Sequence, residues 1–175
     1  EQNERALYAF EALYAITQDA RYNQAITNLK SWLRGMYSPA AHLFHSAATF
    51  KNNTEWVKTP LGLNPNDPND YAYIATDVMA LAPLKMMFED SGFGDTQTKR
   101  NDEVAAMLWA IETATGTFKD ASFRPLLFRF SVNEGEGNNY YGSVEISSHM
   151  ALAYKKSAEF FTQNGDTARA ATYLD

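Results

Sequence analysis

Two carboxylates occupy comparable places in the sequence, each near the expected start of a helix. Asp77 and Glu145 precede the tetrapeptide Met-Ala-Leu-Ala, which occurs at 79–82 and again at 150–153, 71 residues later. Two carboxyl groups can share general acid and base work when one is protonated and the other ionised. Carboxylates are also favoured in the first turn of any helix, because its N–H groups are unpaired there and its dipole is positive. Each residue is therefore a candidate catalytic group or a helix cap.

Aromatic side chains gather in or beside the segments that lack helical periodicity. These are Trp56, Tyr71, Tyr140 and Tyr141. A flat ring near a cleft suits the apolar face of a sugar, and Trp and Tyr add a polar group. The alternative is that these rings pin the long loops onto the helices. Trp32 and Trp109 keep helical spacing with apolar neighbours, so we expect both in the core.

The three histidines do not predict a metal centre. His42 and His45 lie close in sequence, but no pair is spaced four residues apart on a helix beside a third ligand, so zinc is not expected. His149 follows Glu145 by four residues and shares its helix face, as an acid-base partner or as a simple hydrogen-bond partner. The chain also has no nucleotide-binding or nucleophile-elbow motif, and we expect no cofactor.

Apolar residues recur at helical spacing in three pairs of segments, which predicts an all-α fold of antiparallel helical hairpins. The predicted helices are 4–17, 20–34, 73–89, 99–115, 143–162 and 166–175. Asp19 is expected to cap the second helix and Gly35 to end it. Short turns join the helices of a pair, whereas long irregular loops at 37–71 and 117–142 join one pair to the next. This alternation is typical of stacked or ring-closed helical repeats.

Three segments carry a resemblance to a known superfamily. They are 6–22, then 43–46 with 76–82, and 145–154. They are similar to sequence segments of the six-hairpin (α/α)6-toroid superfamily of carbohydrate-active proteins. This superfamily includes glycoside hydrolases, polysaccharide lyases and sugar epimerases. The resemblance implies that residues 1–175 form one helical-hairpin domain, a segment of a larger toroid with its long loops on one rim. The rest of the toroid, or another subunit, is then an expected partner.

The resemblance also implies a function: the protein binds an oligosaccharide or polysaccharide and hydrolyses it. Asp77 and Glu145 would flank the glycosidic bond as acid and base. Trp56, Tyr71, Tyr140, Tyr141 and His149 would contact the substrate. We expect an extracellular or periplasmic location on the same grounds. The alternative is a non-catalytic helical-repeat module for protein–protein or surface assembly.

Composition excludes several other classes. Of the 175 residues, 45% are apolar, enough for a sizeable core. The net charge is −6 and no basic cluster occurs, which argues against nucleic acid as a partner. The absence of cysteine excludes disulfides and thiolate chemistry. No apolar run approaches the ~20 residues of a membrane span.

Overall fold

The fold is described for most of the helical sequence and for short strands between the helices. The computed structural model describes residues 2–45, 48–51, 54–58, 87–115, 117–119, 125–129 and 142–174. Within these ranges the protein is mainly helical, as the periodicity predicts. The predicted ring arrangement of the helices remains a proposal.

The first two helices form the antiparallel hairpin that the sequence predicts. α1 spans Gln2–Thr17 and α2 spans Ala20–Met36. α1 ends at Gln18, which adopts a left-handed conformation with φ of 55° and donates its N–H to Tyr14 O. Asp19 caps α2, as predicted, by accepting a hydrogen bond from the Arg21 N–H. Gly35 does not end α2, which continues one residue further because the chain turns extended only at Tyr37.

Three further helices follow in the second half of the chain. α5 spans Gln97–Thr115, α6 spans Val144–Gln163 and α7 spans Thr167–Thr172. A left-handed Gly165 reverses the chain between α6 and α7, and Asp166 caps α7 by accepting from the Arg169 N–H. These helices match the predicted segments 99–115, 143–162 and 166–175 to within a few residues. Of the predicted helix 73–89, only the last turn at 87–89 lies within the described residues.

The segments predicted as irregular loops contain short antiparallel strands, so the all-α prediction is only partly correct. The strands are β1 (Tyr37–Ser38), β2 (Leu43–Phe44), β3 (Ala48–Lys51), β4 (Glu55–Lys58), β5 (Thr117–Lys119), β6 (Pro125–Arg129) and β7 (Gly142–Ser143). β1 pairs with β2, β3 with β4, and β5–β6–β7 form a three-stranded sheet. Strands of two to five residues are too short to show an alternating pattern in the sequence. A short 3-10 helix, η1 (Ser91–Phe93), precedes α5.

The core is centred on α5 and α6. The largest fully buried side chains are Met87, Val104, Met107, Leu108, Ile111, Ile146, Met150 and Phe161. Phe88 stacks on Phe160 at a ring-centroid distance of 4.3 Å, which joins the helical turn at 87–89 to α6. Polar contacts complete the packing, since Tyr154 Oη donates to Glu112 Oε1 over 2.6 Å between α6 and α5.

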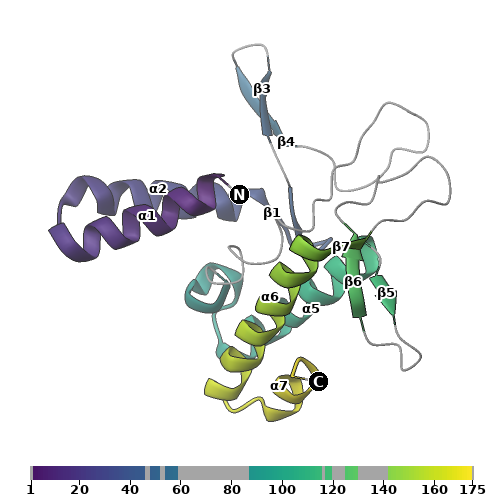
Figure 1. The fold of residues 1–175 in the computed structure, drawn as a ribbon. Coiled ribbons are helices and arrows are strands. Elements are labelled where there is room, and N and C mark those ends of the chain that lie inside the picture. Colours follow the sequence, from purple (N-terminus) through teal and green to yellow (C-terminus); the bar gives the residue numbers. More distant parts are fainter. Residues whose placement is uncertain are drawn as a thin grey trace.

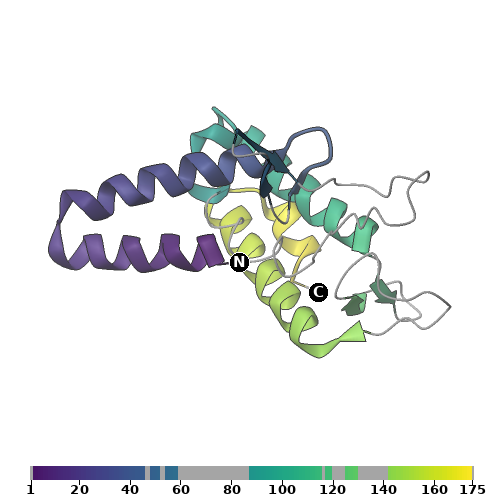
Figure 2. The ribbon, with the colours of Figure 1, turned by 90° about the horizontal axis from the view of Figure 1, so that it is seen from above.

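The α1–α2 hairpin extends away from this core. Figures 1 and 2 show the two helices projecting side by side from the part of the molecule that holds α5, α6 and α7. Leu7, Ile26 and Leu33 are buried, but Ile16 near the far end is 82% exposed. Trp32 on α2 and Trp109 on α5 are 36% and 65% exposed, so the prediction that both lie in the core is wrong. Trp109 points away from the buried side of α5, and Trp32 lies at the border of the buried stripe of α2, beside Leu33 and Met36.

Candidate functional site

Most of the predicted catalytic and substrate-binding residues lie outside the described part of the chain. This holds for Asp77, Tyr71, Tyr140 and Tyr141. Glu145 lies in the first turn of α6, as predicted, but its side chain is among those not described. The separation of the Asp77 and Glu145 carboxyl groups is thus still a prediction. His149 is half-buried one turn further along α6.

Trp56 is placed by the β3–β4 hairpin. It lies on β4 directly opposite Phe50 of β3, and their ring centroids are 5.1 Å apart with the planes tilted by 43°. Trp56 is 62% exposed, Phe50 46% and Val57 41%. Among the residues of the two strands, only Ala48 is partly buried, and it packs against the core. Figure 1 shows the hairpin standing clear of the helices.

This exposure bears on the alternative that Trp56 pins a loop onto the helices. A ring that pins a loop onto a helix would be covered, whereas these two rings face solvent together. Cross-strand aromatic pairs stabilise a hairpin, and the two neighbouring exposed rings form a small contiguous apolar patch, unlike the isolated Trp109. The pair presents the flat apolar area that a sugar face requires, and the Trp56 indole N–H can donate a hydrogen bond beside it.

A cluster of polar side chains, the Glu103 cluster, lies around Glu103 of α5. Tyr37 Oη donates a short hydrogen bond to Glu103 Oε1, and His42 Nδ1 lies 3.0 Å from the same oxygen. Burial and the hydrogen bond to Glu103 raise the pKa of the Tyr37 hydroxyl far above its ordinary range, so Tyr37 keeps its proton and is the donor. Glu103 and His42 stay partly accessible, with 21% and 38% of their side chains exposed.

The local sequence explains how His42 reaches Glu103. Ser38 O accepts a hydrogen bond from the Ala41 N–H, closing a tight turn in which Pro39 suits the second position. His42 follows this turn with φ of 54°, a left-handed conformation that favours Gly or Asn, and returns the chain into β2. Leu43 and Phe44 of β2 are buried, which anchors the turn beside α5.

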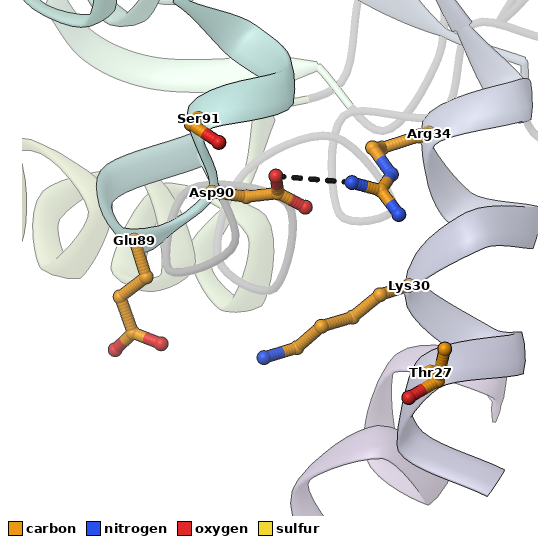
Figure 3. A pocket seen from close by; sticks show the side chains of 6 residues that line it. All are labelled: Thr27, Lys30, Arg34, Glu89, Asp90 and Ser91. Carbon is orange, nitrogen blue, oxygen red and sulfur yellow. Dashed lines mark hydrogen bonds and ion pairs between the residues drawn. The ribbon is translucent and has the colours of Figure 1, made fainter. Parts of the chain in front are cut away.

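The described residues also form one polar hollow of about 290 Å³ between α2 and the segment 89–91 (Figure 3). Lys30, Arg34 and Asp90 are paired within the protein, whereas Glu89 at the rim is exposed to solvent. Arg34 Nη1 lies 3.2 Å from Asp90 Oδ1, which also accepts the Gly92 N–H, and Lys30 Nζ lies 2.9 Å from Glu11 Oε1. The hollow is therefore best explained as a helix junction held by ion pairs.

Sequence reasoning missed Tyr37 and Glu103. Glu103 is 61 residues from His42 and 66 from Tyr37, so no local motif links them. The one available signal is the position of Glu103 immediately before Val104, the first buried apolar residue of α5. A carboxylate at the border of an apolar face needs a partner.

Two further findings on the described part of the chain concern metal binding and membranes. No three metal-binding side chains come together there, and none of its helices is both long and apolar enough to cross a bilayer. The chain matches no protein-family model, no curated protein and no solved structure. The function must therefore be argued from the aromatic hairpin and the Glu103 cluster themselves.

Proposed function

We propose that the protein binds a glycan, an oligosaccharide or polysaccharide, and that Trp56 is the surface on which a sugar ring stacks. One observation carries this proposal: Trp56 and Phe50 form an exposed aromatic pair on a hairpin that stands clear of the core. Apolar C–H faces of sugars pack on such rings, and the polar groups around them accept and donate hydrogen bonds. Tyr71, Tyr140, Tyr141 and His149 are proposed as further contacts to the same ligand.

We also propose that the bound glycan is hydrolysed, with Asp77 and Glu145 as general acid and base. The position of Glu145 in the first turn of α6 supports the expected start of a ring-lining helix. In this proposal the chain is a segment of a larger (α/α) toroid that works outside the cytoplasm, where polysaccharides are found. Carboxyl groups roughly 5 to 10 Å apart would suit either stereochemical course of hydrolysis.

The binding experiment compares two exposed tryptophans. The parent, Trp56→Ala and Trp109→Ala are run on native gels that contain one polysaccharide each, and retardation gives the dissociation constant. Trp56→Ala should weaken binding at least about tenfold, the loss typical of an aromatic anchor. Trp109→Ala is the matched control, because Trp109 is equally exposed but lies on α5. Equal binding by all three proteins would remove Trp56 from the site.

Hydrolysis is tested by release of reducing ends from any polysaccharide that binds. Asp77→Asn and Glu145→Gln should each abolish release while leaving retardation on the gel unchanged, because they remove proton transfer and keep the side-chain shape. If the parent releases reducing ends and both variants do so at the parental rate, these residues are not the acid and base.

A second function is supported by a different surface. Leu13 and Ile16 on α1 are 38% and 82% exposed, and exposed apolar residues on a projecting helix pair suit a protein–protein contact. An assembly module predicts self-association that Leu13→Ser and Ile16→Ser abolish in sedimentation experiments. Glycan binding that persists in both variants would separate this function from the first.

A further inference from the structure

We infer that His42 is a second ligand-contacting group, an imidazole held by Glu103 so that its other nitrogen, Nε2, accepts a hydrogen bond from a hydroxyl of the bound oligosaccharide. The inference rests on the proposed glycan binding for the identity of the ligand. The placement of a hydrogen on Nδ1 rests on geometry alone.

The tautomer of His42 follows from its partner. An ionised carboxylate has no proton to donate, so the contact of Nδ1 with Glu103 Oε1 over 3.0 Å places the hydrogen on Nδ1. In a neutral imidazole the other nitrogen is then an acceptor. Tyr37 donates to the same carboxylate oxygen and is itself partly buried, which fixes the carboxylate in place. Glu103 is thus a positioning residue for His42.

Nε2 is available to a ligand. It has no hydrogen-bond partner among the described residues, and it is absent from the buried polar atoms that lack one. Solvent therefore reaches it. A proton acceptor held in a fixed direction at the surface, and already oriented through its other nitrogen, is suited to a hydroxyl donor.

The backbone at His42 supports a role beyond the turn itself. A side chain with a Cβ atom is disfavoured at φ of 54°, and Gly or Asn would close the same turn with less strain. Gln18, with φ of 55°, adopts the same conformation at the end of α1, so the angle supports a role for His42 only together with the contact to Glu103.

The position of His42 selects the class of ligand. Ala48, at the base of the hairpin that carries Trp56, is the sixth residue after His42, so their Cα atoms are at most ~21 Å apart. One ligand can contact both residues if it is a chain of several sugars. We therefore expect an oligosaccharide to bind more tightly than its monosaccharide.

The test combines imidazole NMR with binding. Long-range ¹H–¹⁵N correlation of the parent should show His42 with its proton on Nδ1, and Glu103→Ala should give a mixture of tautomers. His42→Asn keeps a residue that tolerates the left-handed turn, so it should fold like the parent and bind the oligosaccharide about threefold to tenfold more weakly. Tyr37→Phe keeps the Nδ1 contact and should weaken binding less.

Each outcome decides between the two proposals. If the imidazole proton of His42 in the parent lies on Nε2 instead of Nδ1, the inference about His42 is overturned, whether or not a glycan binds. Binding that is lost in Trp56→Ala but unchanged in His42→Asn also overturns it, and leaves glycan binding by Trp56 intact. If the parent binds none of the polysaccharides or oligosaccharides tested, the proposed function and the inference both fail.

Discussion

The α1–α2 hairpin and the α5–α6–α7 core are both helical, yet they bury their side chains to very different extents. In the core, Met107, Ile111 and Phe161 are wholly buried, and a polar network joins the helices. In the hairpin, burial declines along its length, from Leu7 at 4% exposure near the core to Ile16 at 82% near the far end. When two helices pack only on each other, each buries one stripe of its surface against its partner. The opposite face of each helix therefore stays exposed to water.

This difference separates stability from recognition. The core holds the residues whose loss should unfold the protein, and the projecting segments hold the exposed aromatic and apolar residues that can bind a partner. The β3–β4 hairpin resembles the α1–α2 hairpin in this respect, because nearly all of its side chains are exposed. Substitutions should therefore cost stability in the core and binding in the projections.

The largest effect is expected for Phe161→Ala. Phe161 is fully buried and stacks on Tyr173 at 5.7 Å, so its loss leaves a cavity that costs about 3–5 kcal/mol of unfolding free energy. Ile16→Ala in the hairpin is the control and should change stability by less than about 0.5 kcal/mol. Urea unfolding measures both. Equal losses would contradict the division between core and projection.

Tyr154→Phe should come next. It removes the hydroxyl that donates to Glu112 over 2.6 Å and leaves a half-buried carboxylate short of a donor, at a cost of about 1.5–3 kcal/mol. The matched variant Tyr14→Phe lies on α1, where the hydroxyl has no partner among the described residues, and should be close to neutral. Thermal unfolding compares the two, and a neutral Tyr154→Phe would show that the contact contributes nothing.

Ser157→Ala is expected to stabilise the core, whereas the two preceding core variants destabilise it. Ser157 Oγ is buried in α6 without a hydrogen-bond partner in the described part of the chain, so its removal should raise stability by about 1 kcal/mol. Ser31→Ala on the exposed face of α2 measures the gain from helix propensity alone, about 0.5 kcal/mol. A loss of stability in Ser157→Ala would reveal a hydrogen bond at this hydroxyl.

The smallest effects concern the two helix caps in acid. Hydrogen bonds from Arg21 lower the pKa of Asp19 to about 2. Burial raises the pKa of Asp166, but hydrogen bonds from Arg169 and Asn101 outweigh it, so the net shift is also downward. A lowered folded-state pKa means that each cap stabilises above the unfolded value of ~3.9, and that this contribution is lost as pH falls through the folded value.

The two caps should nevertheless respond differently. Asp166 accepts from Asn101, and its partner Arg169 also contacts Asp102, so it ties α7 to α5. Asp19 contacts only its own turn. Asp166→Asn should therefore lower the midpoint of thermal unfolding at pH 6 more than Asp19→Asn does, and both differences should shrink toward pH 2. A larger effect at Asp19 would contradict this order.

The helices could be predicted from the sequence, whereas the Glu103 cluster could not. Apolar spacing located α1, α2, α5 and α6 because each carries a continuous buried stripe. It misplaced Trp109, because α5 is apolar on more than one side and Leu108 next to it is the residue that faces the core. Trp56 lies on a strand in a segment predicted to be a loop, and its pairing with Phe50 depends on four-residue strands too short to detect. Glu103 and His42 meet only through tertiary packing.

The most direct measurement is a titration of the ¹⁵N-labelled protein with an oligosaccharide, followed through the three indole N–H signals. Each tryptophan reports on a different part of the molecule: Trp32 on the α1–α2 hairpin, Trp56 on the β3–β4 hairpin and Trp109 on α5. Glycan binding at the aromatic hairpin predicts that the Trp56 signal shifts with saturation while those of Trp32 and Trp109 stay in place. Shifts at Trp32 or Trp109 with Trp56 unchanged, or no shift at any of the three, would contradict it.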